Sequence, residues 1–180
     1  MNFVTIIESG ISFGPYSKDD CFYIEHSAAY EKIKGGIKMA EFLWIVKRRR
    51  KAKIYVVEAK SSSPRPENKE NFQEFVSEIR EKLVNALVLF LGLRLGRHEG
   101  AGDEIPENLR DADLATIGFT FVLVVRNHRE EWLVPLQDAL NVQLNSTART
   151  FGLQSPYVAA LNEEMAGSLG LIRREVTVAP

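Results

Sequence analysis

Several features that mark particular protein classes are missing from this sequence. Cys21 is the single cysteine among 180 residues. One cysteine forms no internal disulfide and offers no repeated Cys/His spacing for structural zinc, so Cys21 is predicted to be a core or edge residue. Asn85, Gly92 and Arg94 interrupt the longest apolar run, Leu83–Leu95, which leaves it short of the roughly 18 to 20 residues of a membrane span. The N-terminus shows no basic stretch followed by an apolar one, so we expect a cytoplasmic protein without a secretory signal or membrane segment.

A large excess of charge of one sign is also missing. The chain has 23 basic and 24 acidic residues, which gives a formal net charge of -1. Overall charge therefore does not indicate nucleic-acid binding, and any such role depends on local patches. Hydrophobic residues make up 45% of the sequence, which is ample for one core at this length. We therefore expect a single domain over residues 1–180.

Hydrophobic spacing predicts a mixed α/β fold. Short stretches rich in aromatic and β-branched residues indicate strands, and apolar residues at three- and four-residue intervals indicate helices. The glycines and charges of Gly96–Asp113 indicate a mobile loop. The order of the elements implies a mixed sheet with helices packed on its faces. The expected elements are strands Phe3–Ile7 and Cys21–Ile24 joined by a turn, a short helix within His26–Lys34 capped by Ser27, a hairpin of strands Ile37–Val46 and Lys53–Lys60, helix Asn71–Leu95, strand Ile117–Val125, helix Glu130–Leu144 with Trp132 facing inward, strand Tyr157–Leu161 and a short helix through Ala166 and Leu169.

Three charged side chains are predicted to meet in the hairpin. Glu58 and Lys60 are two residues apart in a strand, so they point to the same face of the sheet. If the turn is centred between Arg49 and Arg50, Glu41 lies directly opposite Glu58, and cross-strand partners share a face. A shift of one residue in register moves Glu41 to the other face, so the prediction depends on the position of the turn.

The predicted pair of Glu41 and Glu58 favours a metal site. Two carboxylates about 5 Å apart repel each other unless a proton or a cation lies between them. A hard divalent ion suits oxygen ligands, so Mg²⁺ or Mn²⁺ is the expected cofactor. Lys60 is placed to position or deprotonate a water and to stabilise charge on a phosphate, which is the chemistry of phosphodiester hydrolysis. The alternative is an ordinary ion-pair cluster on a solvated sheet face, and spacing alone leaves both open.

The sequence context resembles the PD-(D/E)xK nuclease superfamily. Val57-Glu58-Ala59-Lys60-Ser61 is similar to the (D/E)xK strand of that family, with an acid in the preceding strand and a loop and a long helix following. The resemblance covers about Cys21 to Val125. It implies a restriction-endonuclease-like mixed central sheet flanked by helices, whose core is a helix, a three-stranded meander, a helix and a further strand.

The resemblance also implies an activity and roles for individual residues. Glu41 and Glu58 are expected to bind the metal, and Lys60 to assist the hydrolysis of DNA or RNA. The sequence departs from the family at the first acid, where Ala40-Glu41 replaces Pro-Asp. Glu25 precedes the short helix, where many members place a further acid, so it is a candidate accessory ligand. A carboxylate that interacts with backbone N–H groups at a helix entry explains Glu25 equally well.

The sequence leaves several partners and functions open. A basic run at the hairpin tip is suited to contact nucleic-acid phosphates, although a solvated tip is the alternative. The run comprises Lys47, Arg48, Arg49, Arg50 and Lys51. The second functional hypothesis is a catalytically silent domain of the same fold that binds nucleic acid or a protein partner.

A third hypothesis is a structural homodimer that forms through the helix Asn71–Leu95. Val84, Leu89 and Leu93 lie off the main apolar stripe of this helix, so they are expected to be exposed unless a second copy covers them. The three histidines show no metal-ligand spacing, and each is predicted to be a surface residue. They are His26, His98 and His128.

Overall fold

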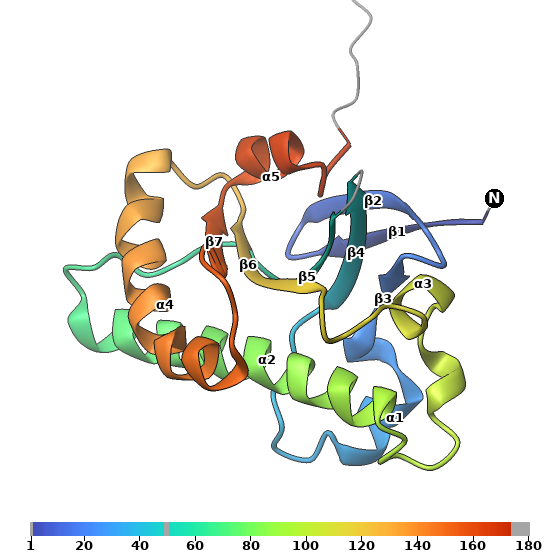
Figure 1. The fold of residues 1–180 in the computed structure, drawn as a ribbon. Coiled ribbons are helices and arrows are strands. Elements are labelled where there is room, and N and C mark those ends of the chain that lie inside the picture. The colour runs from blue at the N-terminus through green and yellow to red at the C-terminus, as the bar shows by residue number, and fades with distance from the viewer. Residues whose placement is uncertain (1, 49–50, 174–180) are drawn as a thin grey trace, which may run out of the picture.

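The computed structural model describes residues 2–48 and 51–173, and their centre is a five-stranded mixed sheet (Figure 1). In their order across the sheet, the strands are β3 (Cys21–Phe22), β4 (Phe42–Arg48), β5 (Lys51–Lys60), β6 (Gly118–Val125) and β7 (Val158–Leu161). Antiparallel pairing joins β3 to β4 and β4 to β5, whereas β5, β6 and β7 run parallel. The predicted mixed sheet is confirmed.

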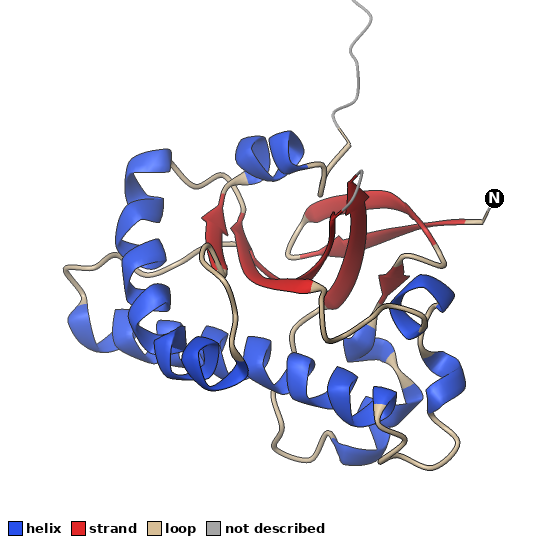
Figure 2. Ribbon diagram, in the orientation of Figure 1, coloured by secondary structure: helices blue, strands red, loops and turns tan. Residues whose placement is uncertain are grey.

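Helices and a small second sheet cover the two faces of the central sheet (Figure 2). The long helices α2 and α4 pack on one face, and a hairpin of β1 and β2 packs with α5 on the other. The predicted flanking helices are therefore present. The further elements are β1 (Phe3–Glu8), β2 (Ile11–Ser17), the 3-10 helix η1 (Ile24–His26), α1 (Ala28–Ile33), α2 (Lys69–Arg94), the 3-10 helix η2 (Gly102–Glu104), α3 (Glu107–Arg110), α4 (Glu130–Phe151) and α5 (Glu163–Leu169).

Strand β5 separates the two cores because its side chains alternate between the faces of the sheet. Ile54 and Val56 are buried in the core beneath α2 and α4. Tyr55 and Val57 are buried in the core beneath the β1–β2 hairpin. The same alternation places Glu58 on the helix-covered face, and its partners on α2, described below, agree with this placement.

The N-terminal hairpin corrects the prediction that Phe3–Ile7 turns directly into Cys21–Ile24. Residues Ile11–Ser17 form a strand of their own, β2, which pairs antiparallel with β1 in a separate two-stranded sheet. Ile11, Phe13 and Tyr16 are buried against the central sheet, so the hairpin has an apolar side that the sheet covers. Gly14-Pro15 lies within this strand. A Gly-Pro pair is typical of a turn, so the sequence did not indicate that Ile11–Ser17 is a strand.

The structure removes the reason to expect a homodimer through α2. Residues 96–113 contain η2 and α3 in place of an irregular loop, and Ile105 and Leu109 are buried in the main core. Leu89 and Leu93 of α2 are buried in the same core, with exposed fractions of 4% and 2%, so they need no second copy to cover them. Val84 is half-buried.

The other helices follow the predicted spacing with small differences at their ends. The Ser27 hydroxyl accepts a hydrogen bond from the Tyr30 N–H at 3.1 Å, which confirms the predicted cap of α1. Helix α4 continues beyond the expected end at Leu144, because Ala148 extends its buried row. Trp132 is half-buried rather than inward-facing. Within the described ranges, no helix has the length and apolar character that crossing a membrane requires.

Candidate functional site

The candidate site lies where β4 begins and β5 ends. Phe42 pairs with Val57, and the Glu41 N–H donates a hydrogen bond to the Val57 carbonyl at 3.0 Å. This is the predicted hairpin register, which brings Glu41 beside Glu58 on one face. Both side chains are buried, with exposed fractions of 4% for Glu41 and 0% for Glu58. The ion-pair cluster of the alternative interpretation is present, because Lys60 and Lys82 pair with Glu58, but its acids are buried rather than on a solvated sheet face.

Helix α2 contacts the residues that precede β4 in the chain. The Ala40 N–H donates to the Lys82 carbonyl of α2 at 3.2 Å. The backbone at Ala40 is thus held by the helix, and β4 begins at Phe42 rather than at the predicted Ile37. This contact also brings the Lys82 side chain to the buried acids.

Two lysines neutralise Glu58. The Lys82 Nζ lies 2.8 Å and the Lys60 Nζ 3.2 Å from the same oxygen, Glu58 Oε1. Burial raises the pKa of Glu58, and the two ammonium groups offset only part of that rise. Burial lowers the pKa of Lys82, but the charge and hydrogen bond of Glu58 outweigh it and leave that pKa raised. Lys82 therefore keeps its proton beside Glu58.

Lys60 connects the buried acid to a second carboxylate nearer the surface. Its Nζ lies 3.1 Å from Glu78 Oε1 on α2. Burial raises the pKa of Glu78, but the hydrogen bond and charge of Lys60 outweigh this effect and lower it overall. Lys38 lies farther out, 3.9 Å from Glu78 Oε2. Lys60 thus bridges the carboxylates of Glu58, which is buried, and Glu78, which is partly exposed to solvent.

Glu41 holds a proton at neutral pH. Burial, a hydrogen bond with the Glu25 side chain and the charge of Glu58 raise the pKa of Glu41 to about 10. The Glu25 N–H also donates to the Glu41 carbonyl at 3.2 Å, so η1 holds Glu25 against the start of β4. The structure therefore brings together all four residues predicted for this site: Glu25, Glu41, Glu58 and Lys60.

The two buried acids leave oxygen atoms available to a ligand. Among the described residues, neither Glu41 Oε2 nor Glu58 Oε2 has a hydrogen-bond partner, although both atoms are buried. A buried polar oxygen without a partner costs about 1–3 kcal/mol. Carboxylate oxygens are the ligands that Mg²⁺ and Mn²⁺ prefer. Over residues 2–48 and 51–173, the acidic and histidine side chains whose ligand atoms all lie within 4.8 Å of one another are Glu8, Glu25 and His26, so Glu41 and Glu58 do not complete such a group with Glu25.

Four residues near the site were missed by the sequence interpretation. Lys82 and Glu78 are one helical turn apart on α2, beside the buried row of Ile79 and Leu83. Charges at the margin of an apolar stripe are the signal that indicates such residues. Glu8 and His26 also lie close by and offer metal-ligand atoms with Glu25. They lie in β1 and η1, and no pattern in the sequence predicts that these two elements are in contact.

The other predicted residues lie elsewhere. Lys47 donates to Asn108 Oδ1 at 2.6 Å and so contacts α3. Arg49 and Arg50 fall outside the described residues, and Arg48 and Lys51 are described only as paired strand backbone. The His128 ring is half-buried, 3.1 Å from Ser63 Oγ and in edge contact with Trp132. His128 was predicted to be a surface residue, and the structure shows that it is partly buried.

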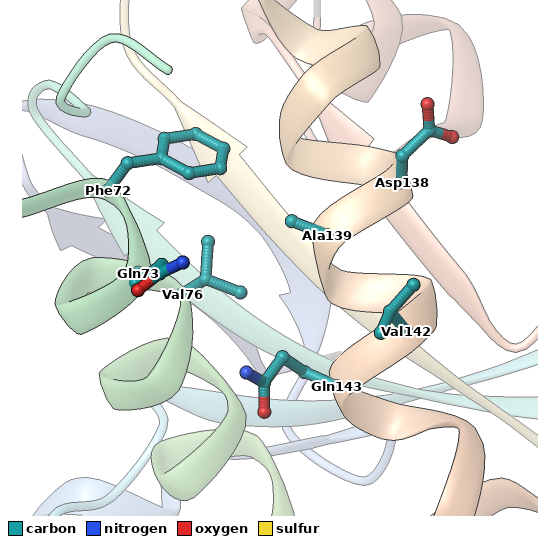
Figure 3. A pocket seen from close by; sticks show the side chains of 7 residues that line it. All are labelled: Phe72, Gln73, Val76, Asp138, Ala139, Val142 and Gln143. Carbon is teal, nitrogen blue, oxygen red and sulfur yellow. The ribbon is translucent and has the colours of Figure 1, made fainter. Parts of the chain in front are cut away.

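A groove between α2 and α4 offers no comparable chemistry (Figure 3). It has a volume of about 360 Å³, and Figure 3 shows Phe72 and Val76 of α2 facing Ala139 of α4 across it. Asp138 is the one ionisable side chain in its lining.

Comparison of the chain with protein-family models, curated proteins and solved structures finds no match. The geometry and charge of the site are therefore the basis of the functional argument. The strongest observation is the buried pair of Glu41 and Glu58, which leaves two carboxylate oxygens without partners beside Lys60.

We predict that Glu41→Gln stabilises the metal-free protein at alkaline pH. The folded pKa of about 10 lies above the ordinary value of 4.5, so the folded state binds one more proton between these values. The contribution of this carboxyl to stability is complete below pH 4.5 and is lost as the pH rises towards 10. Glutamine carries no such penalty. Urea denaturation with EDTA should show a gain of about 1–3 kcal/mol at pH 8 that shrinks towards pH 5.

Glu31→Gln is the matched control for this measurement. Glu31 is exposed on α1, where its carboxylate lies 2.7 Å from the Lys34 Nζ. An exposed ion pair contributes about 0–1 kcal/mol, so this variant should change stability little at either pH. An equal gain from Glu41→Gln at pH 5 and pH 8 would contradict the raised pKa.

Proposed function

We propose that the chain is a metal-dependent nuclease that hydrolyses phosphodiester bonds in DNA or RNA in the cytoplasm. The observation that carries the proposal is the pair of buried carboxylates, Glu41 and Glu58, with unpartnered oxygens beside Lys60. Buried carboxylate oxygens without hydrogen-bond partners among the described residues cost stability, and such costs are typical of functional sites. The acids lie at the carboxyl end of β5, which is parallel to β6, and ligands of α/β sheets bind at such ends.

The topology supports a restriction-endonuclease-like core of the PD-(D/E)xK type in a single domain. Strands β3, β4 and β5 form an antiparallel meander, and α2 then leads to β6, which is parallel to β5. One departure is that α1 lies between β3 and β4, whereas the family core begins with its helix. A second is Glu41 in place of aspartate. Its longer side chain reaches the site from the residue before β4.

The proposed roles follow from charge and burial. Glu41 and Glu58 would hold Mg²⁺ or Mn²⁺, with Glu25 as an accessory ligand. The ion, when bound, supplies an activated water and neutralises charge on the phosphate. Lys60 is half-buried between Glu58 and Glu78, so its ammonium is held where it can stabilise negative charge on the scissile phosphate.

The substrate is proposed from two groups of cationic residues. The basic run Lys47–Lys51 lies at the hairpin tip, at the opposite end of β4 and β5 from the acids, and is proposed to contact phosphates of the polymer away from the site. Arg65 and Arg129 lie 4.9 and 5.1 Å from the ring centre of Trp132. They belong to the segments after β5 and β6, at the same edge of the sheet as Lys60. Cationic and aromatic groups at one edge are suited to a nucleic-acid chain.

A second candidate function is a catalytically silent domain that binds nucleic acid or a protein partner. One observation favours it, because the ammonium groups of Lys82 and Lys60 both lie within 3.2 Å of Glu58 Oε1. Two ammonium groups neutralise the acid without a metal. In that case the lysines are structural, and the chain needs no cation to be stable.

Cation titration separates the two candidates. We expect EDTA-treated wild type to bind Mg²⁺ and Mn²⁺ in isothermal titration and to melt at a higher temperature when they are present. Glu58→Gln removes a ligand charge and should weaken Mg²⁺ binding at least about 10-fold. Glu31→Gln, on the exposed face of α1, should bind as the wild type does.

The result that contradicts the nuclease is wild type that binds neither cation. Salt-sensitive binding to nucleic acid without metal would then favour the silent domain. Equal Mg²⁺ affinity in wild type and Glu58→Gln would place the cation elsewhere and would remove the basis for both the metal site and the role of Lys60.

A further inference from the structure

A second cluster of metal-ligand atoms adjoins the acid pair. Glu8 ends β1, and Glu25 and His26 lie in η1. One ligand atom from each residue lies within 4.8 Å of the others. The His26 Nε2 is 4.0 Å from Glu8 Oε1. Glu8 belongs to the N-terminal hairpin, whereas η1 is hydrogen-bonded through Glu25 to the residue before β4 of the central sheet. The cluster therefore lies where the hairpin meets the central sheet.

Tyr23 holds two members of this cluster in place. Its hydroxyl donates a hydrogen bond to Glu8 Oε1, and its ring lies against the His26 imidazole with centroids 4.3 Å apart. Outer groups that orient a carboxylate and an imidazole are characteristic of built metal sites.

A buried oxygen without a partner lies on Glu41, the residue that adjoins this cluster. Glu41 is 4% exposed, and its side chain shares a hydrogen bond with Glu25. Its Oε2 atom has no hydrogen-bond partner in the part of the chain that the structure describes. The Glu25 N–H donates to the Glu41 carbonyl at 3.2 Å, so Glu41 lies directly beside the cluster. An acidic cluster on the surface alone does not produce a buried unpartnered oxygen.

We propose that Glu8, Glu25 and His26 form a second divalent-cation site, with Glu41 facing it, that prefers Mn²⁺ and similar transition ions to Mg²⁺. The imidazole determines this preference, because nitrogen ligands suit transition ions whereas Mg²⁺ favours oxygen ligands and water. The site shares Glu25 with the proposed nuclease site but goes beyond it, since its ligands Glu8 and His26 have no role in the proposed nuclease and it does not need Glu58 or Lys60. It remains as a binding site even if the chain does not cleave nucleic acid.

A bound ion at this position would also fix the N-terminal hairpin. Ser9, in the turn after β1, donates to the Ala59 carbonyl of β5 at 3.0 Å. Glu8 precedes that contact, and Glu25 is joined by its backbone to Glu41. An ion on Glu8 and Glu25 therefore links β1 to the start of β4. We expect Mn²⁺ to protect the amides of β1 and β2 from hydrogen exchange.

Electron paramagnetic resonance with Mn²⁺ tests the site without reference to activity. We expect Glu58→Gln protein to bind Mn²⁺ and to show nitrogen coupling from one imidazole in the pulsed spectrum. His26→Gln in the same background should lose the nitrogen coupling and weaken Mn²⁺ binding at least about 10-fold. Glu8→Gln should weaken binding similarly while retaining the coupling. Because Glu58 is absent throughout, failure of the nuclease proposal does not affect this result.

His98→Gln and Glu31→Gln are the matched controls. His98 lies after α2 beside Gly92, and Glu31 is exposed on α1. Both should leave Mn²⁺ binding and the nitrogen coupling unchanged, and circular dichroism should show that every variant is folded. Mn²⁺ binding without nitrogen coupling, or binding that His26→Gln and Glu8→Gln leave intact, would overturn the second site.

Discussion

Lys60→Ala is expected to lower the rate of nucleic-acid cleavage by about 10²–10³-fold while Mg²⁺ binding persists. Removing one preorganised group that stabilises transition-state charge has an effect of this size. Lys60 is not a proposed metal ligand, and its Nζ lies 3.2 Å from Glu58 Oε1 and 3.1 Å from Glu78 Oε1. Its removal therefore changes the charge offered to the phosphate and leaves the carboxylates in place. Single-turnover assays on single- and double-stranded DNA and RNA with Mg²⁺ or Mn²⁺ measure this loss.

Glu58→Gln should give a different pattern from Lys60→Ala. It is expected to lose cleavage and Mg²⁺ binding together, because Glu58 is the buried acid at the centre of the proposed site. Comparing the two variants separates a residue that holds the ion from one that acts on the substrate. If both variants lost Mg²⁺ binding equally, Lys60 would be a structural partner of Glu58 rather than a catalytic residue.

Lys38→Met is the control for the loss of a positive charge near the site. Lys38 is about half-exposed, and its Nζ lies 3.6 Å from Glu81 and 3.9 Å from Glu78. Its removal should leave cleavage within about 2-fold of the wild type, since exposed ion pairs contribute little. Cleavage by purified Lys60→Ala at the wild-type rate would contradict the proposed mechanism.

The part of the fold that follows local patterns was predictable from the sequence. Alternation in β5 and the position of the hairpin turn gave the pairing of Phe42 with Val57, and apolar spacing gave both long helices. Strand β2 was missed because Gly14-Pro15 interrupts its local pattern, although the strand buries Phe13 under the hairpin. The burial of Leu93 was missed because it depends on the packing of the segment 96–113, which the sequence indicates only weakly.

The residues of the candidate site also fall into two groups, those that local patterns predict and those that depend on the packing of distant segments. Glu41, Glu58 and Lys60 were found because two strands of known register fix their relative positions. Lys82 was missed because its contact with Glu58 depends on how α2 is rotated over the sheet, which hydrophobic spacing gives only coarsely. Glu8 approaches Glu25 through the packing of a separate hairpin. Spacing along the chain carries no information on such a contact.

Lys82→Met is expected to destabilise the metal-free protein by about 3 kcal/mol, because it leaves a buried carboxylate with one cation in place of two. Glu58 is fully buried, and the Lys82 Nζ provides its shorter ion pair, at 2.8 Å. The double variant Lys82→Met/Glu58→Gln should be less destabilised than the sum of the single variants, since the buried charge is then absent. Urea denaturation at pH 7 with EDTA measures the cycle, and Lys38→Met should cost less than about 1 kcal/mol.

Mg²⁺ then distinguishes a metal site from a purely structural ion pair. In Lys82→Met the carboxylate of Glu58 has lost its nearest cation, so a divalent ion should stabilise this variant more than it stabilises the wild type. The increase in melting temperature on adding Mg²⁺ should therefore be larger in Lys82→Met than in wild type, and absent when Glu58→Gln is added. If Mg²⁺ left all variants unchanged while the cycle still showed coupling, Lys82 and Glu58 would form a structural pair and the silent domain would be favoured. If the cycle showed no coupling, the two side chains would not interact as the 2.8 Å contact requires.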